Sequence, residues 1–173
     1  MKYLYVLSST AADTYYEQFL LSATSLRMKM PNVYIALLTD DKTAKTLTGK
    51  RSAFRDLINE IKVVKIPQDK NMHYRSRFLK TTMRQHITGD FLYIDCDTIV
   101  CRDLSEIEKT QADIAAVLDF HTTADEFEQR IYQWYENIYK KLKFESYTKL
   151  NKLFNGGLMY VRDTEFTHRF FEK

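Results

Sequence analysis

Two aspartates separated by one residue, Asp95 and Asp97, are the residues of this sequence best suited to chemistry. They follow the apolar run FLYI, which predicts a strand that is buried on both faces. Because side chains i and i+2 of a strand point in the same direction, the two carboxylates are expected to face one point. Carboxylate oxygens are the ligands that hard divalent cations prefer, so the pair predicts a site for Mn²⁺ or Mg²⁺.

An Asp-x-Asp pair has alternatives, because chance produces it often and helix capping or loop solvation also places acids after a strand. Two metal-dependent chemistries use it. In phosphohydrolases of the haloacid dehalogenase type the first acid, here Asp95, is the nucleophile. In nucleotide-sugar transfer the two acids hold a metal that stabilises charge on the diphosphate. The hydrolase usually carries the motif on its first strand and needs a later acidic pair, which the sequence does not show.

Six short apolar runs alternate with segments of helical length, and this rhythm predicts an α/β fold. Helices are expected after Asp13, which can cap the first one, within 41–60, and over 73–88, with Gly89 just past the helix end. The expected strands cover 3–7, 33–38, 63–66, 91–95, 114–118 and 158–161. Ligands of open α/β sheets bind beyond the carboxyl ends of the strands, so one site is expected at the edge formed by Ser8 to Thr10, Asp40, Asp95 to Asp97 and Asp119.

The composition fits one compact domain, since 45% of the 173 residues are apolar and 14% are aromatic. The formal net charge of +3 gives no support for nucleic-acid binding. The first apolar run is too short for a membrane span and lacks a signal-peptide cleavage pattern. We therefore expect a cytoplasmic protein with reduced Cys96 and Cys101. Residues 120–152 are expected to form an amphipathic helical insertion, aromatic and basic, which could shape an acceptor site or contact the inner face of a membrane.

Two segments give the sequence a specific family resemblance. The stretch RFLKTTMRQHITGDFLYIDCDTIVCRDLSEI (77–107) and the stretch LFNGGLMYVRD (153–163) resemble glycosyltransferases of the GT-A fold. They are most similar to the retaining family 8 enzymes, which include glycogenin and bacterial galactosyl- and glucosyltransferases. A third and vaguer likeness is ADTYY (12–16). The resemblance implies a GT-A (Rossmann-like) α/β fold over residues 1–173, with a mixed, mostly parallel sheet flanked by helices.

The resemblance also implies an activity and a set of site residues. The activity is metal-dependent transfer of a sugar from a nucleotide diphosphate donor, with a UDP-sugar favoured, to a hydroxyl with retention of configuration. Asp95, Asp97 and Lys80 would be catalytic, the two acids as metal ligands and Lys80 by offsetting charge on the diphosphate. The implied donor-binding residues are Ser8, Thr10, Tyr15, Arg75, Lys80, Asp95, Asp119, Asn155, Gly156 and Gly157.

Several of these assignments have plain structural alternatives. Lys80 shares a helical stripe with Arg77 and Arg84, and such stripes are often only solvated. Tyr16 competes with Tyr15 for stacking on the base. The FNGG segment would also fit a tight turn before a strand.

The family pattern breaks after the FNGG segment. The enzymes that this sequence resembles have a third metal ligand, a His in a C-terminal HxxGxxKPW stretch, which this sequence lacks. We therefore expect an N-terminal part of the fold that binds metal more weakly, with His168 as the one possible substitute. Such a chain could also be a catalytically silent module that binds nucleotide sugars.

Overall fold

The computed structural model describes residues 1–118 and 154–172. Asp119 and the expected insertion at 120–152 lie outside these residues. The chain divides into two compact units, one formed by 1–115 with 157–173 and the other by 116–156. The first unit contains most of the described residues.

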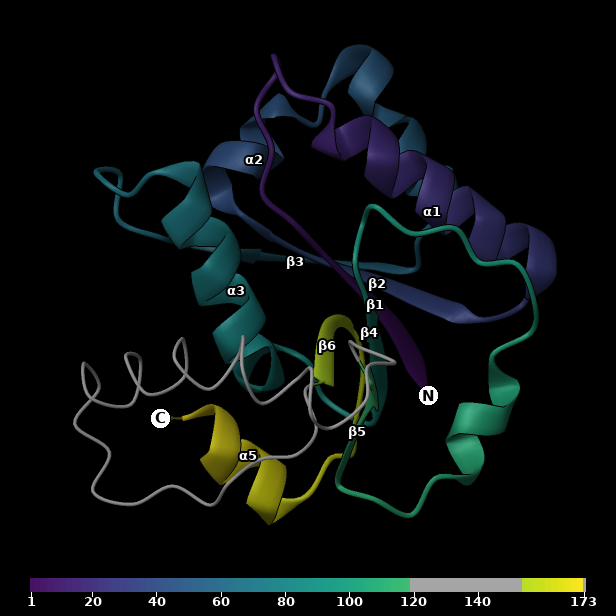
Figure 1. Ribbon diagram of the computed structural model, residues 1–173. Helices are drawn as coiled ribbons and strands as arrows, with labels where there is room; N and C mark the ends of the chain where they lie inside the picture. Colours follow the sequence, from purple (N-terminus) through teal and green to yellow (C-terminus); the bar gives the residue numbers. More distant parts are fainter. Residues whose placement is uncertain (119–153, 173) are drawn as a thin grey trace, which may run out of the picture. The chain divides into compact units, whose positions relative to one another are not determined.

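Helices mostly lie between successive strands along the described chain (Figure 1). The elements are β1 (Lys2–Leu7), α1 (Tyr15–Lys29), β2 (Tyr34–Asp40), α2 (Asp41–Thr46), the 3₁₀ helix η1 (Gly49–Asp56), β3 (Glu60–Val64), α3 (Met72–His86), β4 (Phe91–Ile94), the 3₁₀ helix η2 (Ser105–Lys109), β5 (Ile114–Leu118), β6 (Phe154–Val161) and α5 (Glu165–Phe171). All six expected strands are present. The third is observed earlier in the sequence than expected, and the sixth begins at Phe154, so the FNGG segment is part of a strand rather than a tight turn.

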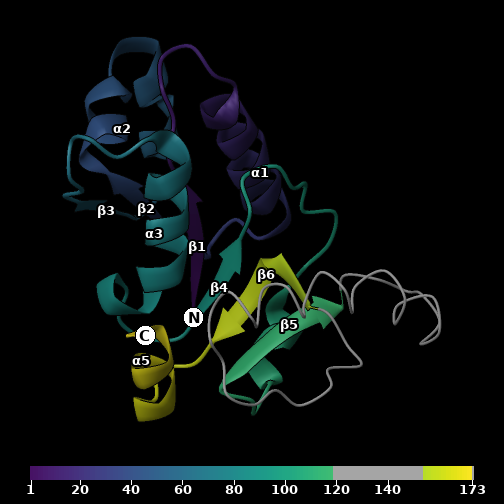
Figure 2. The ribbon, with the colours of Figure 1, turned by 60° about the vertical axis from the view of Figure 1, so that its left-hand side comes forward.

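The six strands form one sheet in the order β3-β2-β1-β4-β6-β5 (Figure 2). β1 pairs in parallel with β2 and β4, and β2 pairs in parallel with β3, whereas β6 runs antiparallel to β4. The expected mixed, mostly parallel sheet is therefore confirmed. Because β1, β2 and β4 are parallel neighbours, the residues that follow them meet at one edge of the sheet.

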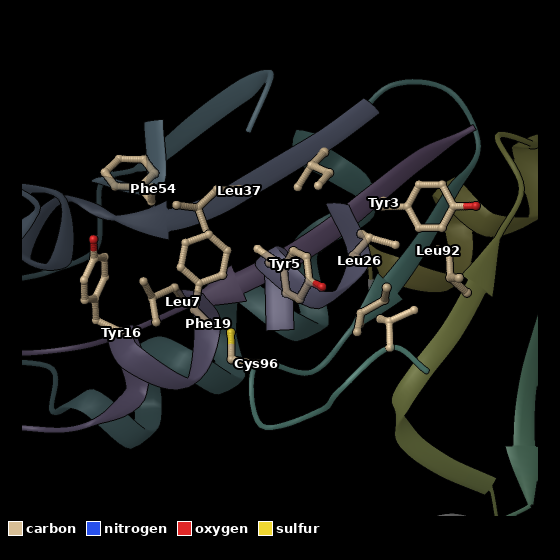
Figure 3. Close-up of a cluster of buried hydrophobic side chains, with 14 of the residues drawn as sticks. Tyr3, Tyr5, Leu7, Tyr16, Phe19, Leu26, Leu37, Phe54, Leu92 and Cys96 are labelled. Carbon is tan, nitrogen blue, oxygen red and sulfur yellow. The ribbon is translucent and has the colours of Figure 1, made fainter. Parts of the chain in front are cut away.

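Each face of the sheet is covered by a separate hydrophobic cluster. On one face Tyr5 and Leu37 of the strands pack with Phe19 and Leu26 of α1 (Figure 3). The rings of Tyr5 and Phe19 meet edge to face, with centroids 5.3 Å apart. On the other face Leu79 and Met83 of α3 pack against strand residues that include Tyr93 of β4. Strands buried on both faces explain the continuous apolar runs of the sequence.

The helix ends follow the sequence signals only in part. Asn71 caps α3 by accepting a hydrogen bond of 2.8 Å from the Tyr74 N–H, and Gly89, with φ +77°, lies just past the end of this helix as expected. Asp13 was expected to cap α1. Thr14 occupies the N-cap position without a side-chain cap bond, and the Asp13 carboxylate accepts from the N–H of Tyr15, the first helical residue, at 3.1 Å. No helix among the described residues is long and apolar enough to span a membrane.

Candidate functional site

A cavity of ≈ 380 Å³ opens where β1 and β4 end. Met72 or His73, Ser76 and Lys80 of α3 follow one another at three or four positions in its lining, so one face of this helix forms a wall. The complete lining is Val6, Leu7, Ser8, Tyr15, Gln18, Met72, His73, Ser76, Lys80, Asp95, Cys96 and Asp97. Two strand ends, the first turn of α1 and one face of α3 thus converge on one site. Ser8 and Asp95 to Asp97 line it as expected, whereas Asp40, expected at the same edge, does not.

Asp95 is held by both its backbone and its side chain. β4 ends at Ile94, but the Asp95 N–H still donates to the Gly157 carbonyl oxygen at 2.7 Å, which extends the pairing with β6. The Oδ1 atom of Asp95 accepts hydrogen bonds from Lys80 Nζ at 2.7 Å and from the Tyr93 hydroxyl at 2.6 Å. Gly157, Lys80 and Asp95 were site predictions, whereas Tyr93 was not recognised in the sequence.

The meeting of Asp95, Lys80 and Tyr93 follows from the fold. Tyr93 precedes Asp95 by two residues, so its side chain leaves the strand toward α3, where it packs with Leu79. The Lys80 Nζ atom lies 5.6 Å from the centroid of the Tyr93 ring. Burial and the nearby Asp95 charge raise the pKa of the Tyr93 phenol, so this hydroxyl stays protonated and donates. A sequence signal could have identified Tyr93 as a site residue, because it lies two positions before an acid at a strand end.

Asp97 and Cys96 differ from Asp95 in their surroundings. The Asp97 side chain is exposed and makes no hydrogen bond or ion pair with the described part of the chain. The Cys96 thiol is buried and donates to the Val6 carbonyl oxygen at 3.3 Å. Burial raises the pKa of this thiol, so it stays protonated in the metal-free protein. Asp95 and Asp97 follow β4 and do not lie within it, so the alternation of side chains along a strand does not explain why they are close. Both nevertheless line the cavity, as predicted.

The two carboxylates suit a hard cation. Within residues 1–118 and 154–172 there is no group of three His, Cys, Asp or Glu side chains that could hold a metal. Mg²⁺ in nucleotide-binding sites is commonly held by one or two carboxylates and completes its shell with phosphate oxygens and water. Asp95 and Asp97 therefore fit a cation that is shared with a phosphorylated ligand better than a cation held by protein alone.

Arg75 does not line the cavity, contrary to its prediction as a donor-binding residue that faces the cleft. Its guanidinium pairs with the fully buried carboxylate of Asp40. The same carboxylate caps α2 through the Lys42 and Thr43 N–H groups and accepts from the Ser8 hydroxyl at 3.0 Å. A buried carboxylate needs a cation, and Arg75 supplies it. Ser8 does line the cavity and is joined to Arg75 through Asp40.

The N-terminal predictions separate into two groups. Tyr15 is 44% exposed and lines the cavity. Tyr16 is buried in the core, and the Arg51 guanidinium lies over it, with the Cζ atom 4.6 Å from the centroid of the Tyr16 ring. Tyr16 therefore does not compete with Tyr15 for stacking on the base. Thr10 is absent from the cavity wall, and its hydroxyl donates to the Asp13 carboxylate at 2.7 Å.

Two other predicted positions lie elsewhere. Arg84 was expected on a solvated stripe but is 1% exposed, and it donates to the carbonyl oxygens of Ile87 and Gly89 at the end of α3. His168 forms a hydrogen bond of 2.7 Å with Asp163, which lies near the start of β4. Asp95 follows the other end of this strand, so the two residues are at opposite edges of the sheet. His168 is therefore not a substitute metal ligand in this structure.

Two of the last three predicted positions lie in β6. Asn155 and Gly156 lie in the first half of this strand and belong to the second unit. Asp119 lies outside the described residues.

Comparison with known proteins agrees with this architecture. The sequence model of the nucleotide-diphospho-sugar transferase family matches residues 24–173. A search of curated proteins found no match. Among solved structures, the galactosyltransferase LgtC, determined in complex with donor and acceptor sugar analogs, has a TM-score of 0.64 and 15% identity, covering 99% of this chain and 62% of that chain.

Two further solved structures share the fold. The glycosyltransferase GlyE of Streptococcus pneumoniae TIGR4 has a TM-score of 0.56 and 15% identity, over 99% of this chain and 37% of that one. The mannosyltransferase Ktr4p from S. cerevisiae has a TM-score of 0.55 and 12% identity, over 99% and 59%. This chain thus spans less than two thirds of the length of these enzymes. A match to a transferase family is evidence against the haloacid dehalogenase alternative. The chain has the GT-A fold and, by the match over residues 24–173, belongs to the nucleotide-diphospho-sugar transferase family.

Proposed function

We propose that this protein is a glycosyltransferase that moves a sugar from a nucleotide diphosphate donor, with a UDP-sugar favoured, to an acceptor hydroxyl. One observation carries the proposal: Asp95, Asp97 and Lys80 line a single cavity at the strand ends. Two carboxylates and an ammonium together suit a diphosphate with its cation. Membership of a nucleotide-sugar transferase family supports the same donor class.

The residues of the cavity have distinct proposed roles. The Lys80 ammonium would offset the negative charge that grows on the diphosphate as the bond from its oxygen to the sugar breaks. Tyr15, an exposed aromatic ring at the cavity, would stack on the base. The Ser8 hydroxyl donates a hydrogen bond to Asp40, so its oxygen can still accept one from an N–H or O–H group of the nucleotide. Arg75 would act indirectly, by fixing Asp40.

Asp95 and Asp97 would hold Mn²⁺ or Mg²⁺. When bound, such an ion supplies positive charge that stabilises the departing diphosphate. The family resemblance of the sequence further supports donor contacts by Asp119, Asn155, Gly156 and Gly157, and retention of configuration. A cytoplasmic location, and a contact of residues 120–152 with the inner face of a membrane, are proposals from the sequence alone.

The proposal is tested by thermal unfolding in the presence of UDP-, GDP-, ADP- and TDP-sugars, each with and without Mn²⁺. A ligand at about 100 times its Kd stabilises the folded state by about 2.7 kcal/mol, which a melting curve resolves easily. We expect the largest shift with a UDP-sugar and Mn²⁺, and its loss in Asp97→Asn. Asp56→Asn is the matched control, because Asp56 is exposed and lies outside the cavity.

The same panel, combined with assays of sugar transfer and of UDP release, separates the alternatives. No shift with any nucleotide sugar would contradict the proposal. A shift without transfer to a sugar acceptor and without release of UDP would instead identify a binding module.

A further inference from the structure

One oxygen of the Asp95 carboxylate receives two hydrogen bonds from within the protein. Lys80 Nζ donates to Oδ1 at 2.7 Å and the Tyr93 hydroxyl donates to the same atom at 2.6 Å. The other oxygen, Oδ2, has no hydrogen bond or ion pair with any residue that the structure describes. Lys80 therefore balances the charge of Asp95, while the Oδ2 atom of Asp95 remains available to bind a cation.

Lys80 is able to leave this position. The side chains of Lys80 and Asp95 are 35% and 30% exposed, unlike the Arg75–Asp40 pair, whose side chains are 5% and 0% exposed. Partly exposed ion pairs contribute little to stability, and the lysine side chain is flexible. Lys80 also lines the same cavity as Asp97. A phosphate bound there is within the reach of its ammonium group.

A divalent cation at Asp95 would meet this ammonium group. Two positive charges at one carboxylate repel each other, so Lys80 opposes the cation as long as it stays on Asp95. A diphosphate in the cavity offers Lys80 another anionic partner. Transfer of the ammonium group to the diphosphate would remove the repulsion and leave the Asp95 charge to the cation.

We propose that Lys80 is exchanged between two anions: it neutralises Asp95 in the free protein and moves to the diphosphate when cation and donor bind. This inference rests on the proposed function. Binding of the cation and binding of the diphosphate are then coupled through Lys80, in addition to any direct contact between them. Tyr93 is the positioning residue of the exchange, since its buried hydroxyl keeps hold of Asp95 after Lys80 has left.

The coupling is measurable because it is reciprocal. The factor by which UDP tightens Mn²⁺ binding must equal the factor by which Mn²⁺ tightens UDP binding, and such factors commonly lie between about 5 and 150. Free Mn²⁺ gives a signal in electron paramagnetic resonance, so its Kd can be measured with and without UDP. The titration uses the complete protein and the variants Lys80→Met, Lys62→Met and Tyr93→Phe.

Each variant has its own expected result. Lys80→Met should bind Mn²⁺ alone at least about fivefold more tightly than the wild type, bind UDP more weakly, and show a smaller coupling factor. Lys62→Met is the charge-matched control, because Lys62 pairs with Glu60 on the edge strand β3 and is outside the cavity. The Lys62→Met variant should show the same Mn²⁺ affinity, UDP affinity and coupling factor as the wild type. Tyr93→Phe should weaken Mn²⁺ binding about 10-fold or more, as loss of a partner that orients a metal ligand commonly does.

The outcomes separate the inference from the proposed function. If the wild type binds UDP but Lys80→Met leaves Mn²⁺ affinity and coupling unchanged, the exchange is wrong and the proposed function stands. If neither the wild type nor any variant binds UDP, the proposed function fails. The exchange then fails with it, whatever the Mn²⁺ affinities. Thermal unfolding of each variant shows whether a change in binding reflects loss of the fold.

Discussion

Asp95 and Asp97 are equivalent in the sequence pattern but not in the structure. Asp95 accepts two side-chain hydrogen bonds and pairs through its backbone with β6. Asp97 is exposed and bonds no described residue. The tight contacts of Asp95 make it part of the protein framework, whereas Asp97 has a position at the cavity without a structural task.

This difference predicts unequal effects of the two acids on stability. Asp97→Asn should change the free energy of unfolding by less than about 0.5 kcal/mol, as expected for an exposed side chain without partners. Asp95→Asn should cost about 1 kcal/mol, since it weakens two hydrogen bonds at a partly exposed group. Urea unfolding of both variants beside the wild type provides the measurement. Equal losses in the two variants would contradict the roles assigned to the two acids.

The Arg75–Asp40 pair predicts a larger effect at a single residue. Arg75→Met should lower the free energy of unfolding by about 3 to 5 kcal/mol, because it leaves a fully buried carboxylate without its cation. Arg77→Met on the exposed side of the same helix serves as the control and should stay within about 0.5 kcal/mol of the wild type. A small effect of Arg75→Met in urea unfolding would show that the remaining donors to Asp40 suffice.

The sequence could predict which residue types gather at the strand ends, because parallel topology alone brings Ser8, Asp40 and Asp95 to one edge. It could not predict the partners of these residues. Whether a basic residue of α3 faces the cavity or the interior depends on the rotation and packing of the helix. Thus Lys80 lines the cavity as expected, whereas Arg75, five positions earlier, pairs with an acid that no local pattern connects to it.

At the scale of elements, apolar runs predicted the existence of all six strands but not their pairing. β6 begins at Phe154, four residues before the expected start, although Gly156 and Gly157 have low strand propensity. The antiparallel register with β4 and the hydrogen bond from the Asp95 N–H to the Gly157 carbonyl override this local preference. Such long-range pairing is not visible in a local pattern, so the FNGG segment was expected to precede the strand.

The contact between Asp163 and His168 of helix α5 predicts that stability depends on pH. The hydrogen bond from His168 is the main cause that lowers the pKa of Asp163, and the Gly89 N–H and the Arg84 charge add to it. A carboxylate with a lowered pKa in the folded state contributes stability above its unfolded pKa of about 3.9, and this contribution is lost as the pH falls through the folded value.

Asp163→Asn should therefore lose less stability than the wild type when the pH falls from about 5 to about 3. The measurement is urea unfolding at several pH values, and the difference between the two curves isolates Asp163 from the other carboxylates. Asp56→Asn is the control, since Asp56 has no partner among the described residues. Parallel curves for Asp163→Asn and the wild type would remove the pH-dependent role of Asp163.

At the scale of the whole molecule, the sheet combines a buried centre with exposed edges. Five of the six β1 residues are buried, and β1 lies between β2 and β4, which are buried almost throughout. β3 is an edge strand with two exposed and three half-buried residues. Site residues come from the ends of the central strands and from the helices on them, so the cavity rests on the part of the fold that has the most buried contacts.

This arrangement predicts a gradient of amide hydrogen exchange. Amides of β1 and β4 should exchange slowest, because they are released only by global unfolding, whereas amides of β3 should exchange faster through local opening at the edge. Addition of UDP with Mn²⁺ should slow exchange further at Ser8, Tyr15 and 95–97, which line the cavity. The exchange rate of the β3 amides should stay unchanged. Equal protection of β3 and β1 would contradict the gradient. Ligand protection confined to β3 would place the donor away from the cavity, since β3 contributes no residue to its wall.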